Sequence, residues 1–151
     1  MTDQRRAMLR RWLSLSAVLE RNIGAPLGPA DRVSPADLVA TMGRLECPLP
    51  AALCEFLLIA GRRADLVGRR DRWVPVEELS LEDGLLVLVR GDTADWGIQD
   101  LNDDDPPVVL WSEGAIRPVG VSLSEFLTDR VRTTLENPIA GLMDLARGTE
   151  N

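Results

Sequence analysis

The stretch GLLVLVRGDTADWGIQDLNDDDPPVVLWSEGAIRPV, residues 84–119, decides the fold. Its apolar run LLVLV (85–89) has no polar alternation, which predicts a central strand covered on both faces of a sheet. The segments DWGIQ (95–99) and PVVLW (107–111) predict two more short strands, and the residues SEG after them predict a hairpin loop into a fourth. Because Pro118 cannot donate a ladder hydrogen bond, this fourth strand should lie at an edge of the sheet or end there.

Three helices are predicted before these strands. The first is amphipathic, with apolar residues recurring on one face at Met8, Trp12, Leu15, Leu19 and Ile23. Ser34 followed by Pro35 starts a second helix that runs to about residue 44. The segment AALCEFLLIAG (51–61) predicts a third helix, which we expect to be buried nearly all round because its only charge is at Glu55.

Helical signals return after the strands. Ser122 and Glu125 have the spacing of a capping box, which predicts a helix to about residue 135. Asn137 and Pro138 predict a final short helix that ends near residue 148.

The order of helices, strands and helices indicates a single α+β domain with an antiparallel or mixed central sheet, flanked by N-terminal and C-terminal helices. Its length of 151 residues is that of one ordinary domain. Within this domain, residues 1–33 are expected to form the amphipathic helix and a linker, and residues 34–151 are expected to form the main α+β unit.

The composition is that of an acidic globular protein. A net charge of −7 argues against nucleic acid or an anionic membrane as the main partner. No stretch reaches the roughly 18 apolar residues needed to cross a bilayer, and no convincing cleavage site follows the first apolar run. Cys47 and Cys54 do not form a disulfide framework, which fits a reducing compartment. We therefore expect cytoplasmic residence.

Residue types needed for catalysis are scarce. The chain has no histidine, the commonest general base and metal ligand, and lacks a GxSxG motif, a phosphate loop and a dinucleotide fingerprint. Asp100, Asn102 and Asp104 match positions one, three and five of a calcium loop. However, Asp105 stands where that loop needs glycine, and Trp111 where it needs a bidentate glutamate. We therefore expect no enzyme, no cofactor and no metal ion.

Charge is segregated along the chain. Residues 77–105 contain ten acidic residues and a single basic one, Arg90, whereas residues 62–72 contain five arginines and two aspartates. Four aspartates between positions 100 and 105 repel one another unless water or a cationic partner screens them. The sequence leaves open whether the arginine-rich segment neutralises the acidic one within the fold.

Rigid residues bracket these carboxylates. We expect a structural frame made by Trp96, Gly97, Pro106, Pro107 and Trp111. The frame would display carboxylates that bind a protein partner, namely Asp92, Asp95, Asp100, Asp103, Asp104 and Asp105. A preorganised acidic loop loses little entropy on binding and speeds encounter with a basic partner.

The order of PLPAALCEFLLIAG, WVPVEEL, GLLVLV, DWGI, DDPPVVLW and SLSEFL, over about residues 48–127, resembles the SUKH superfamily. That family is named for a fungal cell-wall assembly regulator and its bacterial relatives. The resemblance implies an α+β fold, no established catalytic residues, and a role as an immunity protein that neutralises a cognate toxin. Many such toxins act on nucleic acids through basic clefts, so the resemblance also implies a basic partner.

Three functions are therefore carried forward. The first is an immunity protein that binds one toxin domain, and the alternative is a regulatory interaction module of the same fold with no toxin partner. A toxin gene directly upstream would favour the first. The third is a metal-dependent hydrolase using the carboxylates at 100–105, which calorimetry with calcium, magnesium and manganese would exclude if no heat of binding appeared. The oligomeric state stays open.

Overall fold

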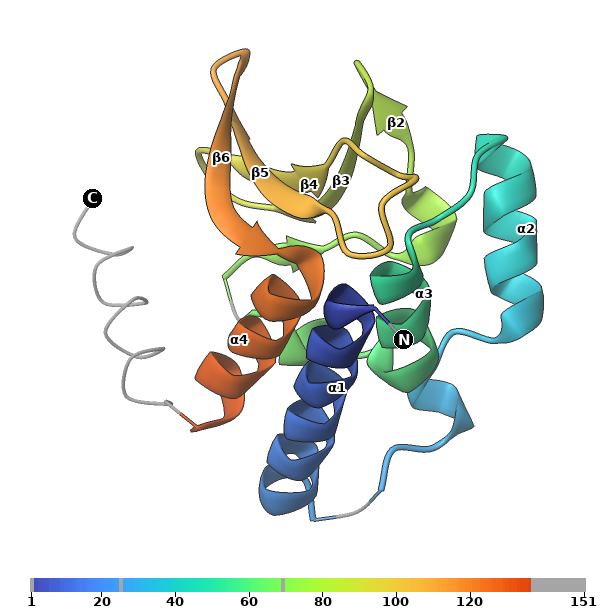
Figure 1. The fold of residues 1–151 in the computed structure, drawn as a ribbon, viewed down its shortest axis with the longest axis vertical. Helices are drawn as coiled ribbons and strands as arrows, with labels where there is room; N and C mark the ends of the chain where they lie inside the picture. The colour runs from blue at the N-terminus through green and yellow to red at the C-terminus, as the bar shows by residue number, and fades with distance from the viewer. Residues whose placement is uncertain (1, 25, 69, 137–151) are drawn as a thin grey trace.

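The computed structural model describes residues 2–24, 26–68 and 70–136, which form one α+β domain (Figure 1). Its longer helices are α1 (Asp3–Asn22), α2 (Pro35–Leu45), α3 (Ala51–Ala60) and α4 (Leu123–Glu136). Its strands are β1 (Arg72–Trp73), β2 (Leu81–Glu82), β3 (Leu85–Arg90), β4 (Asp95–Ile98), β5 (Pro107–Ser112) and β6 (Ala115–Ser122). The short helix predicted to start at Asn137 lies outside the described residues.

The described strands form one antiparallel sheet in the order β1-β3-β4-β5-β6, with β2 also paired to β3. β3 therefore lies inside the sheet, and residues 85–89 are all buried, as their apolar run predicts. Figure 1 shows α1, α3 and α4 grouped on one side of this sheet. The prediction of an α+β domain with helices flanking a central sheet is confirmed.

The hairpin of β5 and β6 has a shorter loop than the sequence suggests. Ser112 pairs with Ala115, so Glu113 and Gly114 alone form the turn. Both have positive φ, 53° and 77°, as a two-residue type I′ turn requires. Among the described strands β6 pairs with β5 alone, so Pro118 lies on an edge strand, as predicted.

Local capping signals place the helix starts correctly. The Ser34 hydroxyl accepts a hydrogen bond from the Asp37 amide at 3.1 Å, and Pro35 opens α2. At the start of α4, the Ser122 hydroxyl accepts from the Glu125 amide at 3.5 Å. These bonds satisfy donors that the first turn of a helix otherwise leaves without a partner.

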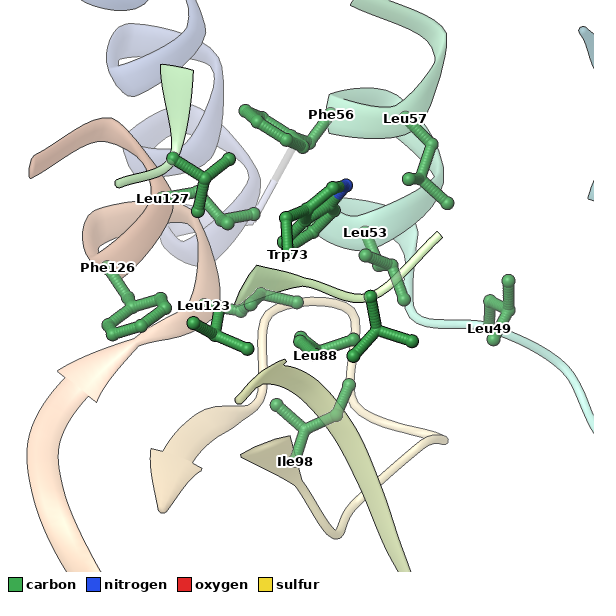
Figure 2. Close-up of a cluster of buried hydrophobic side chains, with 14 of the residues drawn as sticks. Leu49, Leu53, Phe56, Leu57, Trp73, Leu88, Ile98, Leu123, Phe126 and Leu127 are labelled. Carbon is green, nitrogen blue, oxygen red and sulfur yellow. The ribbon is translucent and has the colours of Figure 1, made fainter. Parts of the chain in front are cut away.

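The main core lies between α3, α4 and the sheet (Figure 2). Trp73 of β1 projects into it and makes an edge-to-face contact with Phe56 of α3, with ring centroids 5.6 Å apart. The indole N–H of Trp73 donates to the Gly61 carbonyl at 3.1 Å, so its polar atom is satisfied. Trp12 of α1 packs on the other side, 6.3 Å from Phe56. The N-terminal helix therefore belongs to the same core as the rest of the domain.

The prediction that α3 is buried nearly all round is confirmed for all but one of its residues, since five are buried, four are half-buried and one is exposed. Leu53 and Leu57 are buried on its inner face, but Leu58 is 37% exposed. Glu55 is half-buried, and it accepts a hydrogen bond from the Trp12 indole at 2.7 Å and forms an ion pair with Arg5. No helix in the described ranges is both long and apolar enough to span a membrane.

Candidate functional site

The acidic loop, residues 99–106, connects β4 to β5 and also closes the ends of two helices. The carbonyl oxygen of Asp104 accepts a hydrogen bond from the amide of Ala52, in the first turn of α3, at 2.8 Å. The carbonyl oxygen of Pro106 accepts one from the amide of Leu123, the first residue of α4, also at 2.8 Å. Both bonds go to amides that a helix cannot satisfy internally, so they fix the loop backbone against the helices.

Asp105 is the anchor of this loop. Its carboxylate is buried and accepts from the amide of Ser124 at 2.8 Å and from the Ser124 hydroxyl at 2.6 Å. The guanidinium of Arg11, on α1, lies 3.2 Å from the same carboxylate. The prediction that Asp105 is displayed to a partner is therefore wrong, because the carboxylate caps α4 and joins it to α1.

Three helix N-termini converge on the acidic loop. Figure 1 shows the first turns of α1, α3 and α4 at the same end of the helical layer, next to the loop. The side chain of Gln4, in the first turns of α1, donates to the Asp103 carboxylate at 2.7 Å. Helix N-termini carry partial positive charge, which stabilises nearby carboxylates. The run of aspartates is thus compensated in part by backbone dipoles, which a count of charged side chains does not include.

Two further carboxylates of the predicted site have arginine partners. Asp95 lies 3.1 Å from Arg90, which also pairs with Glu82 at 2.8 Å. Asp92 lies 3.6 Å from Arg70, although its side chain remains 82% exposed. The acidic segment is therefore compensated within its own fold at Asp92 and Asp95, as it is at Asp105.

The arginine-rich segment 62–72 neutralises part of the acidic one, which answers the question left open by the sequence. Arg62 donates to Glu77 at 2.7 Å, and Arg72 donates to Glu78 at the same distance. These pairs lie around the 3-10 helix Val76–Glu78. This helix follows β1, which lies at the opposite end of the strand order from β6. They do not involve the acidic loop.

The hydrogen bond from Arg62 lowers the pKa of Glu77 below its ordinary value of 4.5. A carboxylate with a lowered pKa stabilises the fold above its ordinary pKa, and this contribution disappears as the pH falls through the lowered value. Replacing Arg62 with glutamine should raise the pKa of Glu77 toward its ordinary value, as measured by NMR titration of the side-chain carboxyl carbon. The pKa of Asp65, which Arg63 lowers in the same way, serves as the internal control and should not move.

The carboxylates left for a partner are those at 100, 103 and 104. Asp100 is exposed, and within the described ranges its carboxylate accepts one hydrogen bond, from the amide of Asn102 at 3.3 Å. Asp103 is half-buried because it holds the loop, accepting from the Asp105 amide at 3.0 Å. Asp104 is exposed, and its side chain has no hydrogen bond or ion pair within the described part of the chain. Asp100 and Asp104 are therefore the carboxylates best placed to contact another molecule.

The predicted frame residues occupy the strands beside the loop. Gly97 is buried in β4, and Trp111 is half-buried at the end of β5, packed against the core. Pro106 is buried at the end of the loop, whereas Pro107 opens β5 and is exposed. Trp96 is half-buried beside Phe126 and Arg130.

A contact on α4 that the sequence did not indicate holds Trp96 in place. The ring centroid of Trp96 lies 6.5 Å from that of Phe126. The guanidinium of Arg130 stacks over both rings, 4.5 Å from the centroid of Trp96 and 5.1 Å from that of Phe126. Arg130 also pairs with Asp71 at 2.6 Å. No local sequence signal joins these residues, because they come from three separate segments of the chain.

Fixed carboxylates can attract cationic groups on another molecule. Within the described ranges, no group of three or more histidine, cysteine, aspartate or glutamate side chains is placed to hold a metal ion. No family model, curated protein or solved structure matches this chain.

Proposed function

We propose that this domain is a non-catalytic protein-binding domain, an immunity protein that binds and neutralises a basic toxin domain in the cytoplasm. The observation that carries the proposal is the acidic loop. Its backbone is bonded to the first turns of α3 and α4, while Asp100 and Asp104 remain exposed without an arginine partner among the described residues.

The anchored backbone supports this proposal on energetic grounds. A loop already fixed by the hydrogen bonds of Asp105 and Pro106 loses little conformational entropy when a partner binds. Its exposed carboxylates carry negative charge at a defined position, which accelerates encounter with a positively charged surface. The resemblance to the SUKH superfamily supplies the class of partner.

The proposal is tested by identifying the partner. A tagged full-length chain is expressed in the source cell, and bound proteins are identified by mass spectrometry. The expected partner is a basic toxin domain whose purified activity falls to zero at an equimolar ratio of this protein. A partner that has no toxic activity, or whose activity is unchanged by stoichiometric binding, contradicts the proposal and favours a regulatory module.

Charge reversal at Asp104 should slow association with that partner. We expect Asp104→Arg to reduce the association rate constant by about tenfold at low salt, since steering by charge changes such rates by 10- to 1,000-fold. The difference should shrink in 1 M salt, where the Debye length is about 3 Å. Stopped-flow or surface plasmon resonance measures both effects.

The matched control is Glu20→Arg, which changes the net charge equally. Glu20 is exposed near the opposite end of α1 and has no partner in the described part of the chain. Asp103 is not suitable as a second test site because its carboxylate holds the Asp105 amide. Equal association rates for the two variants at low salt would show that the acidic loop does not steer binding.

A further inference from the structure

A polar hollow of about 340 Å³ lies in the groove between α1 and α4, which pack side by side (Figure 1). The side chains that line it recur at helical spacing on one face of each helix. They include Arg10, Arg11 and Ser14 of α1 and Glu125, Thr128, Asp129 and Arg132 of α4. None of these residues belongs to the acidic loop.

The hollow is positively charged although the protein is acidic. Three arginines and two carboxylates line it, a local charge of +1 in a chain whose net charge is −7. Arg10 is exposed, and its guanidinium has no hydrogen bond or ion pair among the described residues. An anion is therefore attracted to this hollow and repelled by much of the remaining surface.

The arginines of the hollow carry more hydrogen-bond donors than the fold uses. A guanidinium has five N–H donors. Arg11 donates through Nη1 to Asp105 and Ser124, and in the described part of the chain its Nε and Nη2 have no acceptor. Arg132 donates through Nη2 to the Ser14 hydroxyl at 2.6 Å. The hollow therefore has donors to spare for a ligand that carries acceptor oxygens.

Thr128 adds a polar group that the fold leaves unsatisfied. This residue is 4% exposed, and its hydroxyl oxygen has no hydrogen-bond partner within the described ranges. A buried hydroxyl without a partner is costly, and such groups in folded proteins are few. Threonine in a helix takes two χ1 rotamers, so this hydroxyl can change direction to meet a ligand oxygen.

We propose that the hollow binds a phosphate group, as inorganic phosphate or as the end of a small phosphate monoester. Arg10, the spare N–H groups of Arg11 and the Thr128 hydroxyl donate to its oxygens. Guanidinium groups bind phosphate through charge-assisted hydrogen bonds. A phosphate group presents three terminal acceptor oxygens, whereas a carboxylate presents two. Phosphate therefore fits donors that come from three side chains on two helices.

Isothermal titration calorimetry of the full-length chain tests this site, with inorganic phosphate and glycerol phosphate as the two probes. We expect saturable binding of one probe molecule per chain, and the tighter probe distinguishes free phosphate from a monoester. Proton–nitrogen NMR should show the largest shifts at the side chains of Arg10 and Arg11 and at the Thr128 amide. The proposal is overturned if neither probe saturates, or if the largest shifts lie elsewhere.

Three substitutions test the contacts. Arg10→Gln should weaken binding about fivefold, the upper value for a partly exposed charge pair. Thr128→Val, which removes the hydroxyl, should weaken it about threefold. Glu125→Gln should tighten binding, by up to about fivefold, because the half-buried Glu125 carboxylate lines the hollow and repels an anion. These three side chains have no hydrogen bond or ion pair in the described part of the chain, so the variants should fold.

The matched control is Arg117→Gln. Arg117 is exposed on β6, outside the hollow, and has no partner among the residues that the structure describes. Its replacement changes the net charge as Arg10→Gln does and should leave phosphate affinity unchanged. Equal affinities for the Arg10→Gln and Arg117→Gln variants overturn the proposal, as does a Thr128→Val variant that binds phosphate as tightly as the unsubstituted chain.

Discussion

Replacing Asp105 with alanine is expected to lower the free energy of unfolding by about 3–5 kcal/mol, the range found when one partner of a buried ion pair is removed. The Asp105 carboxylate is 5% exposed and accepts from the Ser124 amide and hydroxyl as well as from Arg11. Alanine leaves the Ser124 amide in the first turn of α4 without its acceptor, and the Ser124 hydroxyl loses the carboxylate to which it donates. Arg11 loses its ion pair with the carboxylate but still donates to the Ser122 and Ser124 hydroxyls.

Urea denaturation measures this effect, and Asp104→Ala is the matched control. Asp104 is the neighbouring carboxylate, its side chain is exposed, and its contribution to the fold is a carbonyl bond that alanine retains. Its replacement should change stability by no more than about 0.5 kcal/mol. Asp105→Asn, which keeps one acceptor oxygen but not the charge, should fall between the two. Equal stabilities for the two alanine variants would contradict the anchoring role of Asp105.

Gly97→Ala is expected to lower the free energy of unfolding by about 2–3 kcal/mol, the upper part of the range for an added methyl group in a packed site. A Cβ at Gly97 would lie 2.5 Å from the carbonyl oxygen of Leu86 and 3.1 Å from the Leu85 side chain. The Leu86 carbonyl belongs to β3, the most buried strand, so it cannot move away without disturbing the sheet.

The control substitution for this prediction should raise the free energy of unfolding instead of lowering it. Gly43 lies in α2, and a Cβ there would meet no atom within 4 Å. Gly43→Ala should therefore raise stability by about 0.5–1 kcal/mol through the helix propensity of alanine. Thermal and urea unfolding of both variants give the comparison. If Gly97→Ala leaves the free energy of unfolding unchanged, the backbone of β4 can move away from Leu86 at little cost, which would contradict this prediction.

The features that sequence predicted correctly depend on neighbouring residues. Ser34 caps the helix that begins at the next residue, and the apolar run 85–89 needs only its own composition to indicate a buried strand. The hairpin of β5 and β6 joins strands that are adjacent in sequence, although its turn, Glu113 and Gly114, is one residue shorter than predicted. In each case the interacting groups lie within a few positions of one another, so the pattern is visible before the chain is folded.

The candidate site was predicted less well because its partners are distant in sequence. Arg11 is 94 positions from Asp105, and no local pattern indicates that the two meet. The capping box at Ser122 was recognised, but the Ser124 amide is bonded by a carboxylate 19 residues earlier. Counting charges along the chain therefore located the acidic loop but could not tell which aspartate holds it in place.

The contacts between α1 and α4 have a consequence for biosynthesis. They join residues that are 113 to 118 positions apart, including Ser14 with Arg132 and Arg21 with Glu136. On the ribosome, the first helix is therefore made long before the last helix that covers it. Its apolar side chains, Met8 and Leu15 among them, stay without their final neighbours until α4 has been translated. The domain thus closes late, after α4 has left the exit tunnel.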